Sequence, residues 1–334
     1  MPLSKTKCLG QPNGVVGAHD MACTHEALSP YTRDGSGGPT PTTTAQDRFA
    51  QRLRGVLSRI NARLREAIID NDLFNLRDEA LVDDVPDRVF DFPTSRAKIT
   101  GFLRWLRNQL DEKLLTVVGE DNNQFIRQAY LAGVRNVHNQ LSETGVVFER
   151  PELDDLVTRP LHATELRTLA QRTYENLQSV RDDVAQGVRD ELLDGFRDGQ
   201  NPREIARSLT DRVDSIGKHR ATMIARSEVM NAYSEGTLRR TEELNRDTGA
   251  GISVAHGEWD AAMDTRTCPF CRALDGVDLT PSEMRSNAVQ FRGSVYRLKP
   301  PAHPNGRCNT RVMPGSRPEG SLSERLPAEI NLLS

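Results

Sequence analysis

Four side chains in the last quarter of the chain have the residue types of a zinc site. Cys268 and Cys271 enclose a Cys-Pro-Phe-Cys turn, and His303 and Cys308 follow in a second short segment. A structural zinc ion is held by four such sulfur and nitrogen ligands in a tetrahedron. Because protein would fill all four positions, no vertex would remain for a catalytic water. The spacing predicts a structural Zn2+ that joins the two segments.

Turn-forming residues surround both ligand pairs. Pro269 and Gly276 favour a turn at the first pair, so that two thiolates can point to one side. The second pair lies among residues that exclude regular structure, namely Pro300, Pro301, Pro304 and Gly306. A loop of this kind gains order from a cross-link. Between the pairs, residues 291–298 have the composition of a strand or hairpin.

Two other interpretations of the cysteines stay open. Cys268-Pro-Phe-Cys271 also resembles the redox turn of a dithiol oxidoreductase, in which one thiolate attacks and the other resolves. That chemistry needs the pair between a strand and a long helix, whereas Gly276 and Pro281 follow soon after the pair. A structural disulfide or free thiols form the remaining alternative.

The same residues resemble a known signature. The order Asp264-x-Arg266-Thr-Cys-Pro-x-Cys, followed by Pro-Pro-x-His-Pro-x-x-Arg-Cys, is similar to the C-terminal motif of the phage Mu F-like minor head proteins, the phage head morphogenesis family. Arg226-Ser-Glu228 resembles the family's helical Ile-Ala-Arg-Thr-Glu motif. Together the motifs span residues 161–314. Many members carry a further cysteine where this chain has Gly306, so the resemblance leaves Cys308 as the fourth ligand.

Composition limits the class of protein. The chain has 334 residues, 5% aromatic and 27% charged, which is enough for two domains but argues against one large core. The net charge of −3 predicts no attraction of the whole protein to nucleic acid. No apolar run has the length of a membrane span and no secretory signal is visible, which predicts synthesis in a cytoplasm and no membrane contact.

Helical periodicity dominates the first three quarters of the chain. Apolar residues recur every three or four positions in segments that begin near residues 46, 99, 125 and 166. The sequence further predicts a short helix over residues 203–213 that ends near Gly217, and a separate helix over residues 218–244. The latter carries a stripe of mostly small residues that lets another element approach closely. That stripe comprises Ala221, Ala225, Val229, Ala232 and Gly236.

The predicted fold is α+β and mainly helical, in four parts. A flexible leader covers residues 1–45, and an N-terminal helical region covers residues 46–150. Residues 151–314 form the Mu F-like part, helical over 161–245 and a β-rich, zinc-stapled Cys/His module over 252–314. Residues 315–334 form a tail whose apolar end is either a partner-binding peptide or frayed.

A basic stretch near the module predicts local contact with nucleic acid. Seven cations occur there without an Asp or Glu among them: Arg285, Arg292, Arg297, Lys299, Arg307, Arg311 and Arg317. Such residues would contact DNA phosphates without reading sequence. The alternative is that these charges offset zinc-bound thiolates or the acidic helices. The leader also contains Cys8, His19, Cys23 and His25, whose irregular spacing favours chance over a second metal site.

The resemblance implies a structural minor capsid protein of a tailed virus, made in the host cytoplasm and present in the virion. Its expected partners are the portal protein, the major capsid protein and possible DNA phosphates. No constellation of His, Glu and Asp forms a convincing catalytic site, so an enzyme is not predicted. Arg226, Glu228, Asp264 and Arg266 are expected to be structural. The alternatives are a dithiol oxidoreductase and a zinc-bearing DNA-binding protein.

Overall fold

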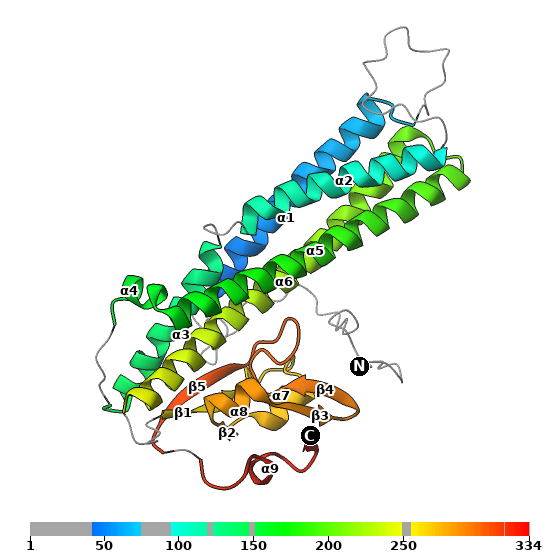
Figure 1. The fold of residues 1–334 in the computed structure, drawn as a ribbon. Helices are drawn as coiled ribbons and strands as arrows, with labels where there is room; N and C mark the ends of the chain where they lie inside the picture. The colour runs from blue at the N-terminus through cyan, green and yellow to red at the C-terminus, as the bar shows by residue number, and fades with distance from the viewer. Residues whose placement is uncertain are drawn as a thin grey trace, which may run out of the picture.

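A computed structural model describes residues 42–74, 95–118, 123–146, 151–248, 255–316 and 318–333. Long helices form an elongated bundle, and a small module with two antiparallel sheets lies against one side of it (Figure 1). The prediction of a mainly helical chain with a small β-rich C-terminal part is therefore confirmed. No helix within the described ranges combines the length and apolar character needed to cross a bilayer.

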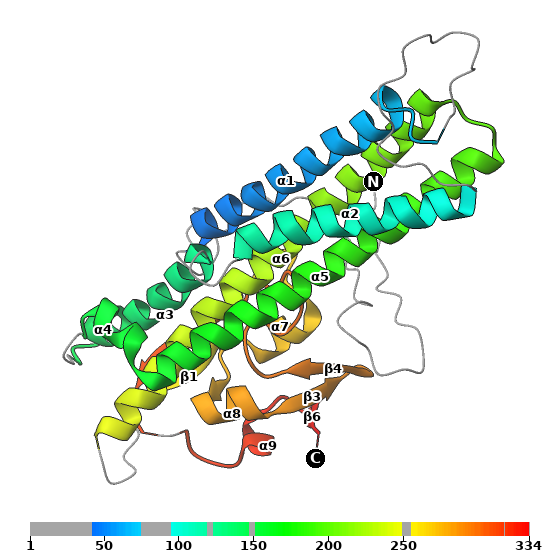
Figure 2. The ribbon, with the colours of Figure 1, turned by 45° about the horizontal axis from the view of Figure 1, so that its top comes forward.

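The bundle is built on its last helix. Its elements are α1 (Thr43–Arg65), the π-helical turn η1 (Glu66–Asp70), α2 (Ser95–Val118), α3 (Gln124–Glu143), α4 (Leu153–Thr158), α5 (Pro160–Arg197) and α6 (Pro202–Asp247). The 46 residues of α6 reach roughly 70 Å at 1.5 Å per residue. Helices α1 and α3 lie one after the other along α6, and α5 runs beside it (Figure 2).

Helix α6 does not stop at Gly217, so the prediction of two helices was wrong. Asn201 caps the helix by accepting hydrogen bonds from the backbone N–H groups of Arg203 and Glu204, and the helix then continues through Gly217 to Asp247. A Cβ at Gly217 would lie 2.7 Å from Leu57 Cδ1 of α1. Tertiary packing therefore outweighs the cost of glycine in a helix, roughly 1 kcal/mol.

Helices α3 and α6 cross at two glycines. A Cβ at Gly236 would lie 2.0 Å from the carbonyl oxygen of Tyr130, and one at Gly133 would lie 2.1 Å from that of Tyr233. These distances are far below any van der Waals contact, so the two backbones touch only because neither residue has a side chain. The predicted close approach along the small-residue stripe of α6 is confirmed.

One continuous apolar core joins α1, α2, α3, α5 and α6. It includes Phe49 and Leu106 from the N-terminal half and Val184 and Val229 from the C-terminal half. The boundary predicted near residue 150 thus falls between helices that share this core, and α4 lies within the expected junction.

The module contains two three-stranded antiparallel sheets. The first has the order β2-β1-β5, from Asp278–Leu279, Ala255–Asp260 and Asn309–Pro314, and the second has the order β4-β3-β6, from Ser294–Arg297, Ala288–Phe291 and Ile330–Leu332. Three short helices complete it: α7 (Pro269–Leu274), α8 (Pro281–Ser286) and α9 (Leu322–Arg325). The first residues of the predicted β-rich module, 252–254, lie outside the described residues.

A separate apolar core fills the module. Trp259 and Met284 are fully buried, and the ring of Phe270 stacks on Tyr296 with centroids 4.1 Å apart. The chain end takes part: β6 pairs with β3, and Ile330 is 5% exposed. The tail is therefore not frayed: Leu326 is buried, and residues 330–332 form a strand.

Ion pairs attach the module to the bundle. Glu235 on α6 is buried and contacts both Arg285 of α8 and Lys299. Arg285 also pairs with Glu165 of α5 at 3.1 Å. Burial alone would raise the pKa of Glu235, but the positive charges of Lys299 and Arg285 outweigh it and hold that pKa below its ordinary value.

Candidate metal centre

The first ligand pair is positioned by the start of a short helix. Cys268 is the N-cap residue of α7, Pro269 occupies the first helical position, and the backbone N–H of Cys271 donates to Cys268 Sγ at 3.3 Å. Proline suits that position because its missing N–H would be unpaired there in any case. One helical turn thus holds both sulfurs on the same side.

The second pair comes from the loop between β4 and β5. The backbone oxygen of Pro304 lies 3.0 Å from His303 Nδ1, and because a carbonyl can only accept, Nδ1 carries the proton of this hydrogen bond. In the neutral ring Nε2 is then the free acceptor, and it faces the cysteines. Gly306 allows a tight turn here, since a Cβ would lie 3.0 Å from the carbonyl oxygen of His303.

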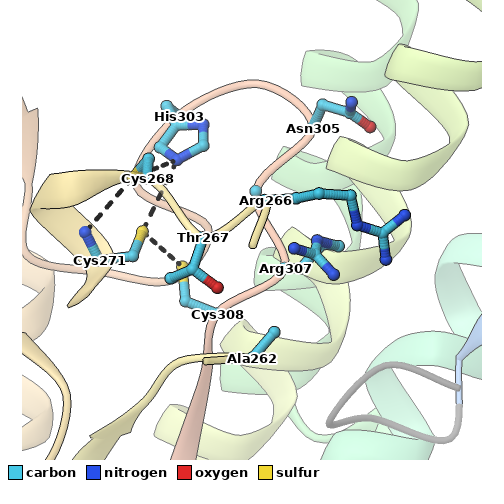
Figure 3. A pocket seen from close by; sticks show the side chains of 10 residues that line it. Ala262, Arg266, Thr267, Cys268, Cys271, His303, Asn305, Arg307 and Cys308 are labelled. Carbon is cyan, nitrogen blue, oxygen red and sulfur yellow. Dashed lines mark hydrogen bonds between the residues drawn. The ribbon is translucent and has the colours of Figure 1, made fainter. Parts of the chain in front are cut away.

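The structure brings the two pairs together (Figure 3). His303 Nε2 lies 3.2 Å from Cys268 Sγ and 3.6 Å from Cys271 Sγ, and Cys271 Sγ lies 3.6 Å from Cys308 Sγ. A tetrahedron with metal–ligand bonds of about 2.0–2.3 Å has edges of roughly 3.3–3.8 Å. These three separations are close to those that one shared ion requires.

The sulfur of Cys308 lies farther from the group than the ligand atoms of the other three residues lie from one another. The ligand atoms of Cys268, Cys271 and His303 all lie within 4.8 Å of one another, and Cys308 falls outside that group although it touches Cys271. All four line one cavity of about 20 Å3, which is room for a single ion or water.

The electrostatics of the cluster make one cysteine a thiolate, whereas the histidine and a second cysteine keep their protons. A hydrogen bond from Cys271, followed by contact with His303, lowers the pKa of Cys268 to about 4, so this sulfur is a thiolate at neutral pH. Burial opposes protonation of His303, yet the hydrogen bond and charge of Cys268 raise its pKa to about 9. The Cys271 thiol, against two sulfurs, has a raised pKa. A divalent cation would displace the protons of Cys271 and His303, because deprotonated sulfur and nitrogen are the forms that bind it.

Asp264 ties the two ligand segments together. Arg307 donates to both of its carboxylate oxygens, at 2.7 and 2.5 Å, and Arg266 donates through its backbone N–H at 2.9 Å. The hydrogen bonds from Arg307 are the largest cause that lowers the pKa of Asp264. Since Arg307 precedes Cys308 and Arg266 lies two residues before Cys268, this contact holds the cysteines in register.

A second tie joins the ligand loop to α6. The backbone N–H of Asn305 donates to Ser227 Oγ at 2.8 Å, and Arg226 donates to Asn305 Oδ1 at 2.5 Å. The helical motif recognised in the sequence therefore contacts the second metal-ligand segment directly. Ser227 and Asn305 were not predicted as site residues, because their contact joins positions far apart in the chain.

Glu228 faces the other way, into the bundle. It is 2% exposed and accepts a hydrogen bond from Asn176 at 2.9 Å, with Arg172 at 3.4 Å. Burial is the main cause that raises the pKa of its carboxyl group. These contacts fit the expected structural role.

Most of the predicted nucleic-acid-binding residues form ion pairs with carboxylates of the same chain. Arg285 and Lys299 contact Glu235, Arg307 contacts Asp264, and Arg311 pairs with Glu258 at 2.7 Å and Asp260 at 3.2 Å. Pairing with Glu235 agrees with the alternative that these charges offset acidic helices, and the partners of Arg307 and Arg311 lie outside the helices.

Two of the seven point outward. Arg292 is exposed, stands over the Phe291 ring and lies 3.4 Å from Glu329, and Arg297 is exposed on β4. Arg317 lies outside the described residues, as do Cys8, His19, Cys23 and His25. DNA contact by any of them stays a prediction.

The surroundings of the Cys-Pro-Phe-Cys turn differ from those of a dithiol oxidoreductase. Helix α7 has only six residues, and β1, which precedes it, belongs to an antiparallel sheet. The long helix and parallel strand pair expected for that redox class do not occur around Cys268 in the described part of the module.

The fold and site thus define a helical scaffold that carries a small Cys/His module. Residues 186–311 match the family described as Phage Mu protein F like protein. This region runs from the last third of α5 into β5 and contains all four candidate ligands, so over this stretch the chain is Mu F-like and the resemblance is confirmed. The searches of curated proteins and of solved structures gave no significant match.

Proposed function

We propose that this protein is a structural component of a tailed-virus head that acts in head assembly. The match of residues 186–311 carries the proposal. The helical bundle supplies long surfaces for contact with other head proteins, of which the portal protein and the major capsid protein are the expected partners. The protein would be made in the host cytoplasm and retained in the virion.

Within this role, Cys268, Cys271, His303 and Cys308 would hold one zinc ion. The separations among their sulfur and nitrogen atoms support this, together with a cavity for a single ion. Zinc would supply structural cross-linking, with no open vertex once Cys308 is bound. It would fix the ligand loop, which Ser227 and Arg226 hold against α6, so that the module keeps one orientation on the bundle.

The decisive experiment for the head assignment is mass spectrometry of intact, purified particles, with co-purification of the portal protein as a second readout. We expect the chain in particles at a fixed copy number relative to the major capsid protein. Its absence from particles that assemble in its presence would contradict the assignment.

Metal content tests the zinc proposal separately. We expect about one zinc per chain by elemental analysis, lost in Cys271→Ala and kept in Cys8→Ala, which removes one thiol from the leader. Equal zinc content in the two variants would contradict the proposed ligand set.

A dithiol oxidoreductase remains the second candidate, because Cys268 caps a helix and its pKa is lowered to about 4. The short α7 and the crowding by His303 and Cys308 weigh against it. Turnover in an insulin-reduction assay that is lost in Cys268→Ser would support this candidate over the structural one.

A further inference from the structure

Three arginines from separate segments meet beside the metal centre. Arg226 comes from α6, Arg266 from the segment between β1 and α7, and Arg307 from the loop between β4 and β5. Figure 3 shows Arg266 and Arg307 extending from the pocket toward the helix. Asn305, which also lines the pocket, bridges to Arg226 with an Oδ1–Nη1 distance of 2.5 Å.

Arg226 has no carboxylate partner within 4.0 Å among the residues that the structure describes. Burial is the main cause that lowers the pKa of its guanidinium, followed by the positive charge of Arg307, with Arg266 adding to it and Asp47 opposing. A half-buried guanidinium next to two like charges is costly unless an anion comes close.

Asp264 forms no ion pair with Arg226. Its two oxygens are taken by both terminal nitrogens of Arg307 and by Nε of Arg266. The Asp264 carboxylate is therefore already bound by Arg266 and Arg307, and Arg226 donates to Asn305 instead. Arg266, Arg307 and Asn305 line the cavity at the Cys/His cluster, and Arg226 of α6 reaches this group through its hydrogen bond to Asn305.

We propose that Arg226, Arg266, Arg307 and Asn305 form a binding site for a phosphate group. Guanidinium groups offer forked donors that match phosphate oxygens, and donors from three directions suit a tetrahedral anion better than a planar carboxylate. The cavity between the four Cys and His side chains is the one proposed for the zinc ion, so the phosphate would lie outside it, beside Arg266, Arg307 and Asn305.

Two sources would present the same chemistry: inorganic phosphate and the phosphodiester backbone of nucleic acid. This site differs from the basic stretch predicted from the sequence, because its central residue, Arg226, lies on a helix and outside that stretch. The proposal does not depend on the role in head assembly, since it rests on contacts within the chain.

The test uses the full-length protein with its metal. Inorganic phosphate is titrated at constant ionic strength against chloride, and binding is followed by calorimetry. The variant Arg226→Gln removes the charge of Arg226, and Arg189→Gln is the matched control, because it removes the same charge from an exposed position on α5. Zinc content and circular dichroism are measured on the same samples.

We expect saturable phosphate binding by the wild type, weakened roughly tenfold or more in Arg226→Gln and unchanged in Arg189→Gln. Arg226→Lys, which keeps the charge but loses the fork, should bind with intermediate affinity. Equal affinities for the wild type, Arg226→Gln and Arg226→Lys, or no binding beyond that in chloride, would overturn the proposal.

A short single-stranded DNA without terminal phosphates then identifies the source. If it competes with phosphate and loses affinity in Arg226→Gln, the site reads a nucleic-acid backbone. If phosphate binds and the DNA does not compete, the ligand is free phosphate. Both outcomes support a phosphate site and differ only in its natural occupant.

Discussion

The bundle and the Cys/His module are stabilised in different ways. The bundle buries a continuous apolar core along five helices, whereas the module has a small core of its own and a cluster of cysteines and a histidine joined by hydrogen bonds. The interface between them contains buried ion pairs such as Glu235 with Lys299. Burying apolar surface stabilises without direction, whereas ligands and ion pairs set one geometry. The bundle therefore gives stability, and the module gives a defined shape at its side.

Removing the proposed zinc ion should have the largest effect and should separate the two regions. A zinc chelator is expected to abolish the protease resistance of the module while most of the helical circular dichroism remains, because structural zinc contributes about 10 kcal/mol or more to small domains. Limited proteolysis with mass spectrometry measures this. Simultaneous loss of both regions at one chelator concentration would show that they fold as a single unit.

Breaking the buried ion pairs should be next in size. Glu235→Gln leaves Lys299 and Arg285 without their shared carboxylate, at a cost of roughly 3–5 kcal/mol in the free energy of unfolding, as urea denaturation would measure. Because the pKa of Glu235 is lowered in the folded state, its contribution is present above the unfolded pKa and is lost as pH falls through the folded pKa. Wild-type stability that does not fall more steeply with acid than that of the variant would contradict this.

The helix crossing offers a test inside the bundle. Gly236→Ala should cost about 1–3 kcal/mol or more in thermal unfolding, because the new Cβ would meet a backbone oxygen that cannot move aside. Gly55→Ala on α1 is the control, since its Cβ meets nothing closer than 3.8 Å, and it should stabilise by roughly 0.5–1 kcal/mol. Changes of the same sign in both variants would mean that helix propensity, not packing, decides at Gly236.

The exposed pair at the module surface should matter least. The side chains of Arg292 and Glu329 are 65% and 49% exposed. Arg292→Ala is therefore expected to change the free energy of unfolding by no more than about 1 kcal/mol. Thermal denaturation at low and high salt provides the measurement. An effect as large as that of Glu235→Gln would remove the distinction between buried and exposed ion pairs on which the comparison rests.

Local patterns were sufficient for several features. The apolar periodicity of residues 46–68 and 166–196 predicts helices that the structure contains, because an amphipathic stripe is a property of neighbouring residues. The Cys-Pro-Phe-Cys turn likewise directs its two sulfurs to one side through a helix cap and a proline. Ligand types, the small-residue stripe and the cap at Asn201 all have such short-range causes.

The sequence by itself determined which side chains could bind a metal and which segments are helical. Only the tertiary structure decided that α6 continues through Gly217, that the chain end forms β6, and that Arg285, Lys299 and Arg307 contact carboxylates. The physical reason is distance along the chain: Leu57 fills the space beside Gly217, and Glu235 lies 64 positions from Lys299. No local pattern encodes such a partner, because the contact exists only after the helices have packed.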